Sequence, residues 1–325
     1  MNHAIKVHQI GGPDVLSWEA QEVGDPGPGE VRLRHTAIGL NYIDVYFRTG
    51  TYPAPHLPFT PGFEGAGLVE AVGQGVDQFA PGSRVAYAAQ PIGAYSEARL
   101  ISADKLVKLP DSIDDRVAAA MMLKGMTAQY LMRSTVALKA GDTILFHAAA
   151  GGVGLIACQW ACHLGVTIIG TVGSDEKAEL ARAHGCTHTI VYSRENFVDR
   201  VRELTDGQGV DAVYDSVGQD TFEGSLDCLK PRGTLALFGQ SSGNVAPLDP
   251  SILSAKGSLY LTRPTLFHYT ADRESLIHCA TELFEVIQKG AVKADINQEY
   301  ALADAATAHA DLQGRRTTGA SVLLP

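Results

Sequence analysis

The feature that most constrains the fold is an alternation of apolar runs and helical patterns between residues 143 and 263. Apolar runs of strand length occur at 143–148, 166–172, 187–192, 210–217, 233–239 and 258–263. Helical patterns separate most of them, at 152–164, 175–184, 194–205 and 220–229. Continuous apolar strands that alternate with helices predict a parallel sheet covered by helices on both faces. Six such strands are the number in a complete dinucleotide-binding fold.

The first third of the chain has a different pattern. Residues 29–38 alternate polar and apolar side chains, as a half-buried strand does, and residues 1–7 alternate in the same way. Shorter strand-like runs follow at 67–72 and 83–88, the stretch 93–109 is typical of a further pair of strands, and Gly and Pro separate these segments. Many short strands joined by such turns predict a rolled or barrel-like sheet domain.

We therefore expect an α/β protein of two domains, which is also what a length of 325 residues favours. The predicted nucleotide-binding domain covers residues 125–265. A long amphipathic helix at 273–289 and a strand-like run at 319–324 are expected to return to the first domain. That domain is then discontinuous, with residues 1–124 and 266–325.

Charge and hydropathy exclude several classes of function. The chain has 26 Lys and Arg against 36 Asp and Glu, a net charge of −10, and no long basic run. We therefore expect no nucleic-acid partner. No segment approaches the roughly 20 apolar residues that cross a bilayer. We expect no membrane association and a cytoplasmic location.

Five cysteines are present without CxxC spacing, so disulfides and metal sites are not expected. Cys158 and Cys162 are four residues apart in an apolar helical run, which places them on one helix face. A pair of buried thiols is the favoured interpretation, and a redox pair is the alternative.

The sharpest motif is HAAAGGVG at residues 147–154, between a predicted strand and a predicted helix. A helix that begins at Gly152 presents free N–H groups and a partial positive charge to a pyrophosphate. Gly151 allows the backbone to approach the phosphates, and Gly154 allows the helix to pack closely on the strand. Ala149 stands where the first Gly of G-x-G-x-x-G would be. The motif predicts dinucleotide binding.

The end of the second strand indicates which nicotinamide cofactor is bound. NAD enzymes carry Asp or Glu there, whereas this chain has Gly173. The missing side chain leaves room for a 2′-phosphate, which Ser174 and Lys177 could bind. Alternatively, Ser174 is only the helix N-cap and Lys177 a solvated side chain. Asp175 and its acidic neighbour count against a phosphate, but NADPH is the cofactor we predict.

Several segments together resemble a known family. They are HAAAGGVG followed by Gln159, GGPDVL at 11–16, GLNYID at 39–44, PGFEGAG at 61–67 and VYDSVG at 213–218. The resemblance is to the quinone oxidoreductases, the zeta-crystallin-like branch of the medium-chain dehydrogenase/reductase superfamily, and it runs essentially end to end. It implies a Rossmann domain with a doubly wound sheet, a GroES-like catalytic domain, and a homodimer formed through the strand at 258–263.

The same resemblance makes an absence informative. Zinc alcohol dehydrogenases of this superfamily carry Cys where this chain has Asn41 and His where it has Phe63, together with a Cys-rich lobe. A catalytic zinc needs three N or S ligands, so no zinc site is expected. Alcohol oxidation would then lack a Lewis acid. Hydride transfer to an electrophilic acceptor such as a quinone fits better.

The resemblance also implies site residues, with NADPH in the cleft between the domains and its nicotinamide near Asn41. In addition to Ala149, Gly151 and Gly154, the implied cofactor contacts are Tyr130, Gly152, Val153, Gly173, Ser174, Lys177, Tyr192, Ser216, Phe238, Ser241, Arg263 and Arg316. Tyr192 follows the third strand, where it would stack near the adenosine or pack as an ordinary core residue.

The substrate side is less defined. Tyr46 and Tyr52 flank a loop and would line a flat pocket for a planar acceptor, or serve only in packing. With Asn41 they are the candidate catalytic residues, and the proton donor is water or a tyrosine.

Other functions stay open at this stage. Reduction of α,β-unsaturated aldehydes or ketones uses the same hydride geometry. A binding protein without catalysis (a crystallin-like or RNA-binding protein) and an NADPH-dependent redox sensor are further alternatives.

Overall fold

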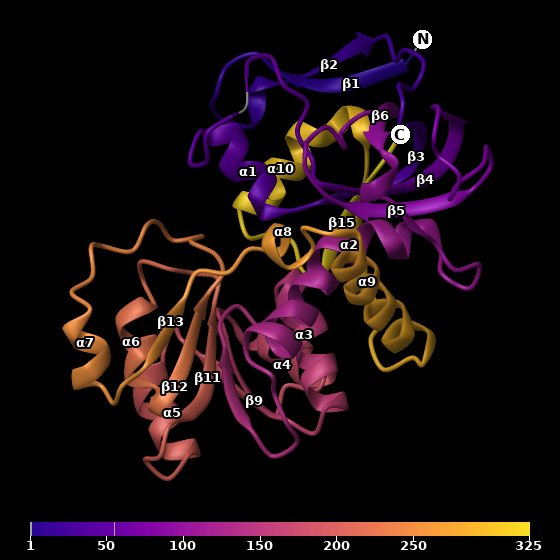
Figure 1. Ribbon diagram of the computed structural model, residues 1–325. Coiled ribbons are helices and arrows are strands. Elements are labelled where there is room, and N and C mark those ends of the chain that lie inside the picture. The colour runs from indigo at the N-terminus through magenta and orange to yellow at the C-terminus, as the bar shows by residue number, and fades with distance from the viewer. Residues whose placement is uncertain (1, 55) are drawn as a thin grey trace. The chain divides into compact units, whose positions relative to one another are not determined.

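The computed structural model describes residues 2–54 and 56–325 (Figure 1). The chain forms two compact units. The first unit consists of Met1–Met126, Thr270–Gln288 and Ala294–Pro325, and the second of Thr127–Tyr269 and Lys289–Lys293.

The second unit is built on a six-stranded sheet. Its strands are β8 (Thr143–Phe146), β9 (Thr167–Val172), β10 (His188–Val191), β11 (Val210–Asp215), β12 (Leu229–Leu237) and β13 (Tyr260–Thr262). They are all parallel and lie in the order β10-β9-β8-β11-β12-β13. This order, with the first strand at the centre, is that of the doubly wound dinucleotide-binding fold.

Six helices accompany this sheet in the second unit. They are α3 (Gly152–His163), α4 (Asp175–Ala183), α5 (Phe197–Leu204), α6 (Phe222–Asp227), α7 (Ser251–Ala255) and α8 (Leu266–Tyr269). α3 packs beside α4, and α5 beside α6 (Figure 1). Leu145, Ile169 and Val213 from the sheet form one apolar core with Phe222 and Leu226 of α6. Burial on both faces explains why these strands are apolar without alternation.

The first unit is rich in β-structure. A hairpin joins β1 (Asn2–Val7) to β2 (Leu16–Gln21). The larger sheet contains β3 (Glu30–Leu40), β4 (Glu64–Val72), β5 (Arg84–Ala88), β6 (Ala98–Ser102), β7 (Val107–Lys108), β14 (Ile296–Ala301) and β15 (Ala320–Leu324). Its order is β14-β15-β3-β4-β5-β7, and β6 also pairs with β3. The C-terminal strands therefore complete a sheet that the N-terminal strands begin.

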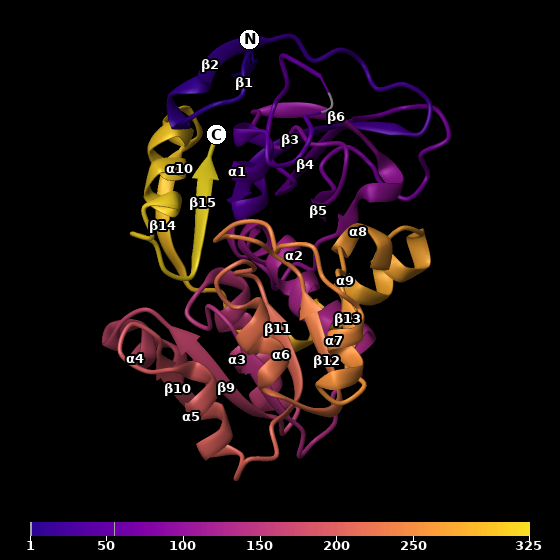
Figure 2. The same ribbon diagram turned by 90° about the vertical axis from the view of Figure 1, so that its left-hand side faces the viewer.

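The first unit also contains helices. They are α1 (Tyr42–Thr49), α9 (Arg273–Gln288), α10 (Ala305–Gln313) and most of α2 (Asp115–Tyr130), which continues as a π-helical turn over Leu131–Thr135. α10 contacts α1 and β14 (Figure 2). None of the helices within the described ranges is both long and apolar enough to cross a membrane.

The fold class predicted from the sequence is confirmed, and the differences are local. β12 begins at Leu229 rather than at 233, because Leu229 already pairs with Val210. The register then breaks around the left-handed Arg232 (φ 66°), and pairing with β11 resumes at Thr234. The sequence did not reveal β2, β14, α1 or α10. The expectation of buried thiols was wrong for Cys162, which is exposed near the end of α3, whereas Cys158 is buried.

Candidate functional site

The predicted cofactor residues of the second unit follow one edge of its sheet. Gly173 comes directly after β9, Tyr192 after β10 and Ser216 after β11. Phe238 and Arg263 follow β12 and β13 in the same way. The carboxyl ends of parallel strands meet at one edge, and ligands of doubly wound sheets bind there. The topology therefore brings these residues to the edge where a dinucleotide is expected.

The turn after β8 has the geometry of a phosphate-binding loop. Ala148 is left-handed (φ 57°), and the N–H of Gly151 donates to its carbonyl at 2.9 Å. Gly151 then caps α3, which begins at Gly152 and continues through Val153. A Cβ on Gly154 would lie 2.6 Å from the carbonyl oxygen of Ala149 and would also collide with that of Ala148. Only glycine allows the helix to start this close to the turn.

A buried hydrogen-bond chain fixes this turn to the rest of the sheet. His147 lies between Thr171 Oγ1 (2.9 Å) and Ser225 Oγ (3.0 Å), and the Ser225 hydroxyl donates to Asp215 Oδ2 (2.9 Å). Nε2 of His147 is therefore the donor to Ser225, and Nδ1 accepts from Thr171. Burial lowers the pKa of His147, although Asp215 opposes the shift, so the ring is neutral and its role is structural.

Asp215, within the motif VYDSVG, is a further functional residue that sequence reasoning did not single out. Its buried carboxylate accepts hydrogen bonds from the N–H groups of Val217 (2.8 Å) and Gly218 (3.0 Å) and from the Thr221 hydroxyl. Together with Ser225, these donors hold the segment after β11 in place. The available signal was an acidic residue at the end of a largely apolar strand.

Gly173 and Tyr192 lie next to each other at the ends of β9 and β10. A Cβ on Gly173 would be 2.8 Å from the Tyr192 hydroxyl oxygen. Tyr192 is 49% exposed, so it is not a core tyrosine. Ser174 is the N-cap of α4 and accepts from the backbone N–H of Lys177 at 3.3 Å. The capping role is thus present, and phosphate binding by these residues stays a prediction.

Of the two acidic residues that count against a phosphate, Asp175 and Glu176, the first is paired with an arginine. Both carboxylate oxygens of Asp175 accept from Arg194 at 2.6 Å. The Arg194 guanidinium also lowers the pKa of Asp175. This bidentate pair offsets the negative charge at the start of α4.

The remaining candidates of the second unit lie in two places. Ser241 donates its backbone N–H to the carbonyl of Ser216 at 3.1 Å, and Arg263 donates to the carbonyl of Leu237 at 2.9 Å. These contacts connect the segments that follow β11, β12 and β13. Tyr130 is buried at the end of α2 and stacks on Tyr269, with 4.5 Å between the ring centroids.

In the first unit, Asn41 belongs to a buried polar cluster. Its Nδ2 donates to Glu64 Oε1 at 2.6 Å, and Lys124 Nζ donates to the same oxygen at 3.0 Å. Glu64 Oε2 accepts from the N–H of Leu123 at 2.6 Å. Glu64 is fully buried, and Asn41 and Lys124 are nearly so. Sequence reasoning did not identify Glu64 or Lys124, because they are 60 residues apart.

Tyr46 and Tyr52 are half-buried and adjacent, with 5.1 Å between ring centroids. Phe47 contacts both the Tyr52 ring (5.7 Å) and the ring of Phe63 (5.3 Å). Phe63 therefore packs against another aromatic ring, and its side chain has no atom that could bind a metal. Among the described residues, no three His, Cys, Asp or Glu side chains gather in a way that could hold a metal ion.

A second buried chain of hydrogen bonds links α1 to Tyr95 and to His309 of α10. Asp44 Oδ2 accepts from the N–H of Asn41 (2.9 Å) and from the Tyr95 hydroxyl (3.0 Å), and burial raises the pKa of Asp44 to about 7. The Tyr95 oxygen lies 3.0 Å from Nε2 of His309, whose Nδ1 accepts from Arg48 (3.1 Å). Burial, with Arg48 nearby, lowers the pKa of His309 to about 3.

Arg316, a predicted cofactor contact, lies in the first unit. It donates to Asp311 Oδ1 from Nε (2.9 Å) and Nη2 (2.7 Å). Its contact with the cofactor, like that of Asn41, stays a prediction.

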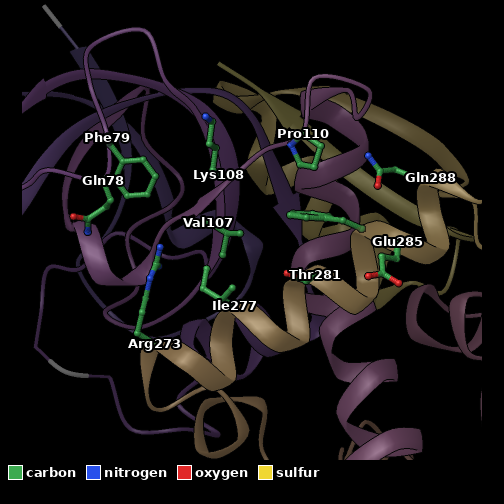
Figure 3. Close-up of a pocket in the computed structure, with 11 residues that line it drawn as sticks. Gln78, Phe79, Val107, Lys108, Pro110, Arg273, Ile277, Thr281, Glu285 and Gln288 are labelled. Atoms are coloured by element: carbon green, nitrogen blue, oxygen red, sulfur yellow. The ribbon is translucent and has the colours of Figure 1, made fainter.

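The first unit also has a groove of about 400 Å³ along α9 (Figure 3). Its walls come from the Gln78 and Phe79 segment, from β7 and from one side of α9, where Arg273 donates to the Asp104 carbonyl at 3.0 Å. None of the side chains predicted to bind cofactor or substrate lines this groove.

Comparison with known proteins agrees with this geometry. Residues 27–111 match the alcohol dehydrogenase GroES-like domain, and residues 152–279 match the zinc-binding dehydrogenase family. A quinone oxidoreductase of Pseudomonas aeruginosa is 58% identical over the full length of both chains. A 2-haloacrylate reductase of a Burkholderia species is 49% identical over 99% of this chain and 98% of its own.

Among solved structures, the quinone oxidoreductase of Escherichia coli, complexed with NADPH, matches with a TM-score of 0.98. It is 48% identical and aligns over 99% of this chain and 100% of its own. Fold, motifs and full-length identity therefore agree, and this chain belongs to the quinone oxidoreductase family of the medium-chain dehydrogenase/reductase superfamily.

Proposed function

We propose that this protein is an enzyme that reduces quinones with NADPH and without zinc. The observation that carries the proposal is the carboxyl edge of the parallel sheet, where a glycine turn, Gly173 and Tyr192 are brought together. Full-length similarity to quinone oxidoreductases supports the same reaction.

The residues at this edge fit NADPH. The N-terminus of α3 offers N–H groups to the pyrophosphate, and a side chain on Gly154 would obstruct the start of that helix. Position 173 carries no acidic side chain that would repel a 2′-phosphate, and the Tyr192 hydroxyl lies 2.8 Å from where its Cβ would be. Ser174 and Lys177 are the donors that we propose for this phosphate. When bound, NADPH supplies the hydride.

The protein contributes position and exclusion of water to the reaction. The half-buried rings of Tyr46 and Tyr52, which are tilted by 56° to each other, offer aromatic faces and edges against which a planar acceptor can pack. The Asn41 side chain donates to Glu64 and its backbone N–H to Asp44, and with these contacts Asn41 would orient the reacting ring. A quinone accepts hydride without a strong acid, so water or a tyrosine hydroxyl suffices as the proton donor.

A second candidate is reduction of an activated carbon–carbon double bond. The 49% identity with a 2-haloacrylate reductase favours it, because that substrate is an unsaturated carboxylate. Hydride would then go to the β-carbon, and a proton to the α-carbon.

NADPH oxidation followed at 340 nm tests both candidates. The purified protein is given 1,4-benzoquinone, a naphthoquinone, an alkenal or 2-chloroacrylate, with NADH run in parallel. We expect turnover with quinones and a preference for NADPH. Turnover only with the unsaturated substrates would replace the first candidate by the second, and binding of NADPH without any turnover would refute both.

We also propose a homodimer formed through β13. This strand is at the edge of the sheet, and Tyr260 on it is 62% exposed. Unpaired backbone groups and an exposed aromatic ring favour pairing with a second copy. Light scattering coupled to gel filtration should give twice the chain mass for the wild type and a lower mass for Tyr260→Lys.

A further inference from the structure

The cluster around Glu64 selects one orientation of the Asn41 amide. An ionised carboxylate only accepts hydrogen bonds, so the NH2 group of Asn41 must face it. The contact in the structure, from Asn41 Nδ2 to Glu64 Oε1 at 2.6 Å, has this arrangement. A neutral amide in place of Glu64 would both donate and accept, and it would leave the orientation of Asn41 undetermined.

The fold makes room for this carboxylate. Gly39 lies on β3 opposite Glu64, and a Cβ there would collide with Glu64 Oε1 and with the carbonyl of Ala119. Lys124 and the N–H of Leu123, both on α2, supply two further hydrogen bonds. Three elements, β3, β4 and α2, thus converge on one buried charge next to Asn41.

Stability alone does not account for such an arrangement. Burying an ammonium ion and a carboxylate removes both from water, and apolar side chains of the same volume often stabilise a protein more. The benefit of the pair lies instead in position, because the Lys124 ammonium and the Leu123 N–H hold the two Glu64 carboxylate oxygens in place beside Asn41.

We propose that Glu64 and Lys124 are positioning residues that hold the Asn41 amide in one orientation for hydride transfer. This inference rests on the proposed reductase function. Neither side chain touches the reacting atoms, so both act through Asn41.

The first test observes the amide directly. In a nitrogen–proton NMR spectrum of the full chain, the Asn41 side-chain signals are those that disappear in Asn41→Ser. The proton donated to Glu64 should be shifted downfield in the wild type and should lose that shift in Glu64→Gln. An unchanged Asn41 signal in Glu64→Gln would overturn the proposal, whether or not quinones are reduced.

The second test measures turnover with NADPH and a quinone. In Glu64→Gln we expect kcat to fall by about 10- to 100-fold, the order of loss for a misplaced reacting group, with KM for NADPH nearly unchanged. A loss confined to KM would contradict the proposal. If the wild type itself turns over no acceptor, the proposed function fails, and the NMR test still decides on the orientation.

The third test replaces Lys124. In Lys124→Met the Glu64 carboxylate loses one of its donors, so kcat should fall by about 10-fold with KM for NADPH nearly unchanged. In Glu64→Gln/Lys124→Met the loss should be no larger than in Glu64→Gln alone, because both side chains act through Asn41. Additive losses of kcat in the double variant would contradict the proposal.

A matched control distinguishes a positioning effect on Asn41 from the general effect of losing an ion pair. Arg84 on β5 pairs with Asp115 on α2 in the same unit and does not contact Asn41. Arg84→Met should leave kcat close to wild type. Equal kinetic losses in Arg84→Met and Lys124→Met would show a general structural effect and overturn the proposal.

Discussion

Replacing His309 should change how the stability of the first unit depends on pH. The His309 ring lies between Arg48 and the Tyr95 hydroxyl and is fully buried, and burial lowers its pKa from 6.5 to about 3. In the unfolded chain this histidine binds a proton below pH 6.5, whereas in the folded protein it stays neutral until about pH 3. The unfolded state therefore binds more protons between these values, and stability is lost as the pH falls.

The size of the effect follows from the two pKa values. One proton of difference corresponds to about 1.4 kcal/mol per pH unit, so His309 lowers the free energy of unfolding by about 5 kcal/mol as the pH falls from 6.5 to about 3. His35 is also buried, with a pKa lowered to about 3, and adds the same slope. Asp44 opposes it, because its raised pKa of about 7 makes the folded state the one that binds the proton.

The assay is urea unfolding at pH 4.5, 5.5, 6.5 and 7.5. Trp18 lies in the first unit and Trp160 in the second, so Trp160→Phe limits the fluorescence to the first unit. In that background, His309→Gln should reduce the slope of unfolding free energy against pH by about 1.4 kcal/mol per unit between pH 4.5 and 6. His56→Gln, at an exposed position, is the control and should leave the slope unchanged. Equal slopes in His309→Gln and the wild type would refute the reasoning.

Three further predictions concern other buried or paired groups. Asp44→Asn should raise the free energy of unfolding at pH 8 by up to about 4 kcal/mol. The raised pKa of Asp44 gives stability that is present at low pH and lost as the pH rises through about 7, and the amide does not ionise. An unchanged urea midpoint at pH 8 would argue against this reasoning. Asp215→Asn should lower the unfolding free energy of the second unit by about 3 kcal/mol, because an amide cannot accept all the hydrogen bonds that the Asp215 carboxylate accepts. Trp160 fluorescence follows unfolding of this unit, and Asp206→Asn, at an exposed position, is the control. Arg194→Met should weaken NADPH binding roughly threefold relative to NADH binding, because Asp175 loses its partner, and the difference should shrink in high salt. Calorimetric titration measures both affinities, and an equal loss for the two cofactors would contradict this prediction.

The strands of the second unit were predictable for a physical reason. Strands buried on both faces are apolar throughout, so β8, β9 and β11 stand out against the helical segments between them. The glycine turn was recognisable because close approach of backbone to phosphate permits few residue types. Strands with one exposed face gave weaker signals, and β14, in which intermediate and exposed residues alternate, was not recognised.

The sequence by itself determined the fold class, the nucleotide-binding turn and the family, because local pattern and short motifs are read from neighbouring residues. Only the tertiary structure decided which polar groups meet. Glu64 and Lys124 are 60 residues apart, and Arg48 and His309 are 261 apart, so no local pattern links them. It also decided that Asp175 is neutralised by Arg194 and that Cys162 is exposed. These contacts and exposures depend on how segments distant in the sequence pack together.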